Sequence, residues 1–173
     1  AWERFSFYGM QTLLVLYMTT QLLLPGHVEH VAGFAAFKAM LEQLFGKMTT
    51  VALASAIFGL YAGGVYLTPL LGGFIADRIL GRTRTITIGA LLMVAGYFMV
   101  ALEVSFLPAL LLLLIGVGMF KGNIASQVGE LYGPADLRRA DAFQINFLGI
   151  NSAVIISAGI KIPKPFHYKI IFA

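Results

Sequence analysis

Residues 107–128 form an apolar stretch long enough to cross a lipid bilayer, and Lys121 interrupts it near the middle. A membrane-crossing helix needs about 20 mostly apolar residues. A lysine at that depth costs roughly 2.5–3.5 kcal/mol on insertion scales, so it is tolerated where it faces a partner charge or a watery cavity. The stretch therefore predicts a membrane helix whose cation points into a helix bundle and has a function there.

The composition of the whole chain is typical of a membrane protein. Of its 173 residues, 59% are hydrophobic and 12% are charged, and the mean hydropathy is +0.86. A soluble domain carries about 25% charged residues. The chain has no basic run suited to nucleic acid, and its lack of cysteine excludes a disulfide scaffold and a thiolate metal site. No nucleophile stands beside an oriented base, and His27, Glu29 and His30 match no zinc spacing. We therefore expect no enzyme, no metal and no cofactor.

Five segments are long and apolar enough to be membrane spans, which predicts an all-α membrane protein. The first connection, 27–47, is polar and is expected to hold a short interfacial helix at 31–37. A basic tail of atypical composition, 161–173, follows the last span. We expect residues 1–160 to form a partial transmembrane half with spans at about 5–24, 50–75, 85–102, 107–128 and 142–160.

Arginines in the connections predict the orientation of these spans, because cytoplasmic loops carry an excess of Lys and Arg. The connection between the second and third spans holds Arg78, Arg82 and Arg84, and the one between the fourth and fifth holds Arg138 and Arg139. Both connections and the N-terminus are therefore expected in the cytoplasm. The membrane is expected to be the inner or plasma membrane.

Two features do not fit a complete protein of this kind. An odd number of spans puts the basic tail, with Lys161, Lys164 and Lys169, on the outside, against the rule that places the arginines inside. In addition, the charged head of the first span, Glu3 and Arg4, begins at the very start of the chain. We expect the chain to be a fragment of a longer protein.

The second span ends in the string GGFIADRILGRTRT, residues 72–85. Small residues such as Gly72 and Gly73 let neighbouring helices approach closely in membranes. The string resembles the signature loop between helices two and three of the major facilitator superfamily, whose transporters contain two six-helix halves. The resemblance implies that this chain is part of the N-terminal half. It also implies a gating and packing role for the residues of this loop: Gly73, Asp77, Arg78, Gly81 and Arg82.

Three further strings resemble motifs of the proton-dependent oligopeptide transporters within that superfamily. They are WERFSFYGM at 2–10, GVGMFKGNIASQVGELY at 116–132 and AFQINFLGINSA at 142–153. Together with the loop, the resemblance runs from Trp2 to about Ile155. The sequence departs from the family pattern at Phe7, where a tyrosine is usual, and at Gln11, where many members have an arginine. Because this arginine is absent at position 11, the sequence leaves open which residue binds the carboxylate of a peptide.

The resemblance implies symport of di- and tripeptides with protons and assigns roles to single residues. Glu3, Arg4 and Lys121 would couple proton movement to substrate movement. A carboxylate, a guanidinium and an ammonium form a network whose pairing changes when the carboxylate is protonated. The other reading of this network is an ion pair that only stabilises packing. The residues implied in substrate binding are Tyr8, Gln11, Tyr66, Lys121 and Asn151.

The partners implied are the peptide, the lipid bilayer and a missing C-terminal half that completes the pocket. Without that half, the fragment is expected to be inactive alone. Two alternatives stay open. The chain could belong to a relative that carries nitrate or another small solute, or it could be a truncated gene product without activity. The intact first-helix motif favours peptides over nitrate.

Overall fold

The computed structural model describes residues 2–132, 136 and 138–159, apart from the side chains of residues 2–4, 12, 158 and 159. Within these ranges the chain is helical, with no strand, and the predicted tail 161–173 lies outside them. The elements are α1 (Trp2–Tyr17), η1 (Met18–Leu22), η2 (Val28–His30), α2 (Phe34–Phe45), α3 (Thr50–Ile75), η3 (Ala76–Leu80), α4 (Arg82–Val100), η4 (Glu103–Ser105), α5 (Phe106–Glu130) and α6 (Arg138–Gly159).

Helices occupy all five predicted spans, but they differ in apolar length. Among the described residues, Thr50–Leu80, Arg82–Val100 and Glu103–Glu130 are long and apolar enough to cross a membrane. In the first span, the apolar helical part is the shorter Leu13–Leu22. Helix α6 begins with Arg138, Arg139 and Asp141, so its first turn is polar. The count of five spans stays a prediction.

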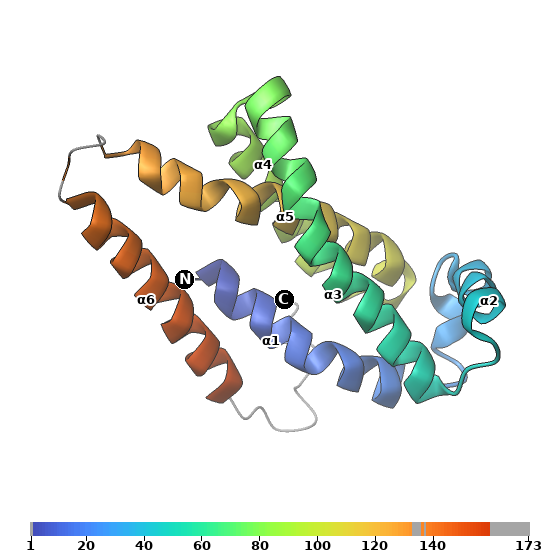
Figure 1. Cartoon of the computed structure of the whole chain (residues 1–173). Coiled ribbons are helices and arrows are strands. Elements are labelled where there is room, and N and C mark those ends of the chain that lie inside the picture. The colour runs from blue at the N-terminus through green and yellow to red at the C-terminus, as the bar shows by residue number, and fades with distance from the viewer. Residues whose placement is uncertain (1, 133–135, 137, 160–173) are drawn as a thin grey trace.

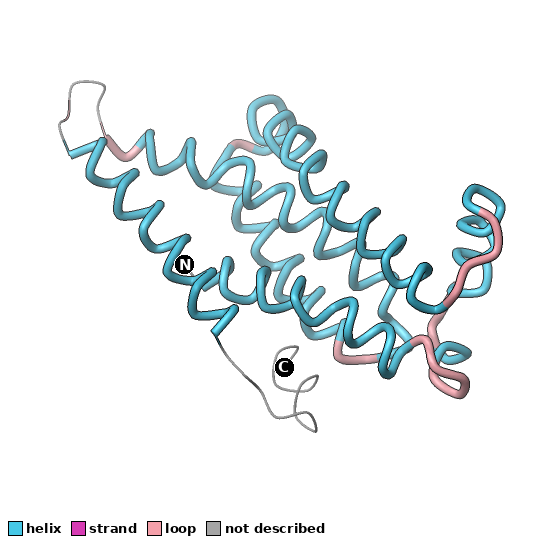
Figure 2. Tube along the Cα trace, turned by 60° about the horizontal axis from the view of Figure 1, so that its bottom comes forward, coloured by secondary structure: helices cyan, strands magenta, loops and turns pink. Residues whose placement is uncertain are grey.

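The helices lie side by side in an elongated bundle (Figures 1 and 2). Helix α5 packs against both α3 and α4, and α1 lies between α6 and α3. Helix α2 sits at one end of the bundle, beside the start of α3. The interfacial helix predicted at 31–37 is found further along the chain, as α2. Gly33, with φ of 74°, interrupts the helical backbone just before Phe34, so the helix begins there.

Glycines set the distance between the central helices. A Cβ placed on Gly72 of α3 would overlap the backbone of Gly118 in α5, and one on Gly89 of α4 would lie 2.9 Å from the carbonyl oxygen of Gly116. These helices therefore touch through their backbones, as small residues permit in membranes. Asn123, which is 2% exposed, adds a bond across this contact by donating to the carbonyl oxygen of Gly72 at 3.1 Å.

The connections at the α2 end of the bundle are tied together by polar contacts. His27 Nδ1 lies 2.9 Å from Glu103 Oε1, and the backbone N–H of Ala32 donates to the carbonyl oxygen of Val104 at 3.0 Å. The first and third predicted connections thus meet at the same end. The connection of Arg82 lies at the other end, where Arg82 bonds to Glu130, the last residue of α5.

Candidate functional site

Lys121 of α5 lies between two aromatic rings that belong to different helices. Its Nζ is 5.0 Å from the ring centroid of Tyr66 in α3 and 5.6 Å from that of Phe7 in α1. Both distances fall within the roughly 6 Å over which a ring face attracts a cation, an interaction of about 0.5–2 kcal/mol. Lys121, a half-buried residue, therefore lies where α1, α3 and α5 meet, in a segment that the sequence predicts to cross the membrane.

Close helix packing explains how Lys121 reaches Tyr66. Gly118 and Gly122 lie three positions before and one position after the lysine. A Cβ on either glycine would come within 2.5–2.7 Å of Thr68 or Pro69 in α3. Helix α5 can approach α3 here only because both side chains are missing. That approach brings the lysine within range of a tyrosine that itself stays 74% exposed.

The second ring is supplied by Phe7, which sequence analysis noted only as a departure from a tyrosine. Phe7 is 2% exposed, and its ring meets that of Tyr8 edge to face, with centroids 5.3 Å apart and planes at 78°. Edge-to-face pairs of this kind are favourable. The predicted Tyr8 thus stands beside the site and supports the ring of Phe7. The family usually has a tyrosine at position 7, and the phenylalanine here lacks its hydroxyl. That difference could have indicated an apolar ring beside the lysine.

The other predicted substrate residues are less closely gathered. Gln11 is half-buried in α1, one turn beyond Phe7 and Tyr8. Asn151 is exposed on α6 and donates its amide to the carbonyl oxygen of Phe147 at 2.8 Å, within its own helix. Glu3 and Arg4 belong to the first turn of α1, but their side chains lie outside the described part of the structure.

The predicted gating loop forms a second polar cluster, at the opposite end of the bundle from α2. Arg82 is its centre: Nη2 lies 3.3 Å from Asp77 Oδ1, and Nη1 bonds to Glu130 Oε1. Arg82, the first residue of α4, is therefore joined to η3 through Asp77 and to the end of α5 through Glu130. Glu130 was missed in the sequence, although a carboxylate at the end of an apolar span can form a charge-assisted bond with an arginine.

The glycines of this loop have separate roles. Gly81 takes φ of 79°, a left-handed conformation that favours glycine, and its carbonyl oxygen accepts a bond from Thr85 Oγ1 at 2.8 Å. The close packing expected of Gly72 and Gly73 belongs to Gly72, because a Cβ on Gly73 would meet nothing within 4 Å. The gating and packing role expected of Gly73 stays a prediction, because the space beside its Cα is open in this structure. Arg78 is exposed in η3.

The cluster continues to the start of α6. Asp136 Oδ1 accepts from the backbone N–H of Arg138 at 3.0 Å, and the Arg138 guanidinium bonds to the same carboxylate at 2.9 and 3.1 Å. The guanidinium, with help from the backbone N–H, holds the pKa of Asp136 below its usual value. A Cβ on Gly129 would lie 3.3 Å from Arg139 Nη2, so both arginine-bearing connections lie at this end.

The described residues offer no group of three or more His, Cys, Asp or Glu side chains that could hold a metal ion. What the site can do follows from its composition: one cation, two aromatic rings and a tyrosine hydroxyl from neighbouring helices. An ammonium with ring faces beside it can bind a carboxylate and an apolar side chain of the same ligand.

Comparisons with known proteins point to one family. The sequence profile of the POT family matches residues 83–161. The di-/tripeptide transporter of Lactococcus lactis subsp. lactis (strain IL1403) is 37% identical over 159 residues, which are 90% of this chain and 28% of the relative. The peptide transporter YePEPT of Yersinia enterocolitica subsp. palearctica serotype O:3 (strain YE-P4) is 36% identical over 161 residues, which are 90% of this chain and 28% of the relative.

Solved structures agree with these relatives. A mutant of the peptide transporter POT in complex with alafosfalin matches with a TM-score of 0.75 and 30% identity, over 99% of this chain and 33% of that one. A POT family transporter in complex with a thioalcohol-conjugated peptide matches with a TM-score of 0.68 and 31% identity, over 90% of this chain and 28% of that one. The chain thus spans about 28% of the length of the curated relatives above.

Proposed function

Because this chain belongs to the POT family of membrane transporters, we propose that it works as part of a proton-coupled symporter of di- and tripeptides. The family consists of transporters and not of enzymes. The observation that carries the proposal is the position of Lys121, whose ammonium stands between the rings of Phe7 and Tyr66. A cation at the junction of membrane helices fits a ligand that brings a carboxylate.

In the proposed mechanism, carboxylates compete for Lys121. The C-terminal carboxylate of a peptide binds the ammonium, and the rings of Tyr66 and Phe7 contact apolar parts of the peptide. By resemblance, Glu3 and Arg4 belong to the same network. Protonation of a carboxylate partner weakens its hold on the lysine, because the neutral acid no longer attracts a cation. Proton entry and peptide entry would thereby be coupled, with protons as the coupling ion and no cofactor.

The residues of this chain enclose only part of the proposed substrate site. On α3, Tyr66, Leu67 and Leu70 are 66–74% exposed, and a Cβ on Gly59 or Gly63 would meet nothing within 4 Å. This face of α3 carries the tyrosine that contacts Lys121, so a lipid surface alone would leave the site open. The remaining part of a longer transporter, a C-terminal half, would cover it. The chain alone is therefore expected not to transport.

Uptake into proteoliposomes with an imposed proton gradient tests this function. We expect the complete transporter to accumulate a radiolabelled dipeptide only with the gradient, and the 173-residue chain to accumulate none. Labelled nitrate serves as the second substrate, because a nitrate carrier of the same family is the alternative. Gradient-driven uptake of nitrate without uptake of dipeptides contradicts the peptide proposal, and dipeptide uptake by the chain alone contradicts the need for a second half.

The proposed location is the inner or plasma membrane, with the N-terminus and both arginine-bearing connections in the cytoplasm. Single cysteines at Arg84 and Ser105 test this, since they replace residues at opposite ends of the bundle. Arg84 is chosen because it is exposed, whereas Arg82 bonds to Asp77 and Glu130. A membrane-impermeant maleimide added to intact cells should label the cysteine at 105 only. Labelling at 84 from outside would reverse the orientation.

A further inference from the structure

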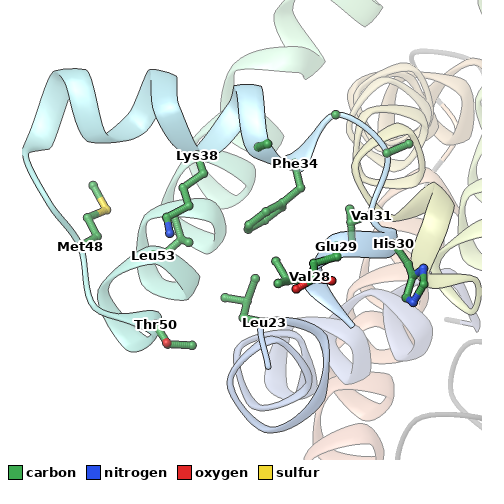
Figure 3. Close-up of a pocket in the computed structure, with 13 residues that line it drawn as sticks. Leu23, Val28, Glu29, His30, Val31, Phe34, Lys38, Met48, Thr50 and Leu53 are labelled. Carbon is green, nitrogen blue, oxygen red and sulfur yellow. The ribbon is translucent and has the colours of Figure 1, made fainter. Parts of the chain in front are cut away.

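A pocket of about 550 Å³ opens at the end of the bundle where α1 ends and α3 begins, below α2 (Figure 3). It is built by four neighbouring segments of this chain: the turn after η1, η2, α2 and the first residues of α3. Its volume falls within the roughly 300–1,000 Å³ of typical small-molecule sites. Thr50 at its edge and Tyr66 at the Lys121 site are 16 residues apart on α3, which is about 24 Å along a helix. The pocket is therefore separate from the site described above.

The floor of the pocket is apolar and firmly held. Leu23, Val31, Phe34 and Leu53 line it and are each 4–7% exposed. Figure 3 shows the Phe34 ring directed into the space, with Leu23 facing it from the turn after η1 and Leu53 from the first turn of α3. Because these side chains are also part of the main core, the shape of the floor is set by the fold. It fits an apolar side chain of a few carbon atoms.

Opposite charges stand on the two sides of this floor. Lys38 of α2 extends its amine into the space beside Leu53, and Glu29 of η2 lies on the other side, beside Val28 (Figure 3). The ring of His30 turns away from the space in the same view. Lys38 has one described partner, Glu42, at 3.9 Å, and both side chains are partly exposed to solvent, so this pair is weak. A ligand carboxylate can take its place and form a closer charge-assisted bond.

We propose that this pocket binds a small zwitterion with an apolar side chain, the chemistry of a free amino acid or a short peptide. The ligand carboxylate bonds to Lys38, its ammonium bonds to Glu29, and its side chain lies on Phe34 and Leu53. The charges are too far from Lys121 to belong to the same binding event. With the orientation proposed above, the pocket opens on the outer face of the membrane, whereas the ligand chemistry rests on the pocket alone.

Binding is measured by a fluorophore attached at Gln43→Cys, an exposed position on α2 outside the pocket lining. This chain has no cysteine of its own, and any others in the complete transporter are replaced. The labelled transporter in nanodiscs is titrated with leucine, leucyl-alanine, leucinamide and N-acetylleucine. We expect saturable responses to leucine or leucyl-alanine, and the tighter of these identifies the source of the zwitterion. Leucinamide lacks the carboxylate and N-acetylleucine lacks the ammonium, so each should bind roughly tenfold more weakly.

Two variants test whether Lys38 and Glu29 cause the differences in affinity between these ligands. Lys38→Gln should weaken leucine binding roughly tenfold and remove its advantage over leucinamide. Glu29→Gln should remove the advantage over N-acetylleucine. The matched control is Lys47→Gln, an exposed lysine of the same connection that does not line the pocket, and it should leave all four ligands unchanged.

Three results would overturn the proposal. One is an equal effect of Lys38→Gln and Lys47→Gln. Another is a response to the lipid headgroup glycerophosphoethanolamine with none to leucine or leucyl-alanine. The third is loss of the response in Lys121→Ala, which would show that the label reports the central site. A transporter that shows the fluorescence response to leucine or leucyl-alanine but takes up no peptide would support ligand binding in the pocket and contradict the transport function. The two proposals can therefore be tested independently.

Discussion

Gradient-driven uptake of dipeptides is expected to fall to background when Lys121 is replaced by alanine. The variant removes the ammonium that stands 5.0 and 5.6 Å from the rings of Tyr66 and Phe7. Without it, a peptide carboxylate loses its cationic partner among the described side chains of this junction, and a carboxylate bound to a charged partner gains about 1.5–3 kcal/mol that is then lost. The proposed competition between carboxylates for this lysine would be lost at the same time. Initial uptake rates in proteoliposomes with and without the gradient measure both effects.

Two matched variants give this prediction its controls. Lys121→Arg keeps a cation that can stack on the same rings, so it should retain part of the uptake. Lys47→Ala removes an exposed lysine outside the bundle and should leave uptake unchanged. Native uphill accumulation by Lys121→Ala would reduce this lysine to a packing role.

The second large effect is expected from Gly72→Ala, a change of one methyl group. The new Cβ would overlap the carbonyl group of Gly118 and come within 2.9 Å of Met119 Cα. Backbone atoms cannot turn aside as side chains do, so α3 and α5 must separate. Overpacking of this kind costs typically about 1–3 kcal/mol, and separation also lengthens the 3.1 Å bond from Asn123 to the Gly72 carbonyl oxygen. Thermal unfolding of the purified transporter in detergent should shift several degrees lower.

Gly73→Ala is the natural control, because it makes the same change at the next residue. A Cβ at position 73 meets nothing within 4 Å. Alanine is also favoured over glycine in a helix by about 0.5–1 kcal/mol, so this variant should be as stable as the native protein or slightly more stable. Equal destabilisation by the two variants would mean that α3 and α5 do not meet through Gly72.

The sequence was sufficient for the helices and for the central cation, because both are set by local rules. Long apolar stretches place membrane helices, and a lysine within one of them is costly unless it faces inward. The structure accordingly has helices at each expected segment, and it brings Lys121 near Tyr66, another residue of the predicted substrate site. The roles of both residues stay predictions. The family and its all-α fold were also predicted, from ordered strings that extend over most of the chain.

What the sequence did not reveal depends on contacts between distant segments. Phe7 looked like a defect in a tyrosine pair, and its ring contact with Lys121 spans 114 positions. Glu130 became a partner of Arg82 only once α4 and α5 were packed side by side. Gly72 and Gly73 are alike in sequence, and only the rotation of α3 distinguishes the one that touches α5. Composition alone could not predict any of these three pairings.

The backbone contacts of Gly72 and Gly89 with α5, together with the bonds of Arg82, make α3, α4 and α5 a single rigid piece. Because these contacts involve backbone atoms, which cannot change rotamer, we expect the three helices to move together. Helix α1 packs against α6 and meets this piece through side chains, which can exchange rotamers as it moves. We therefore expect substitutions at the packing positions of this piece, such as Gly72 and Gly89, to change how much folded transporter a cell contains. Substitutions along α1 should instead change how many substrate molecules each transporter moves per second.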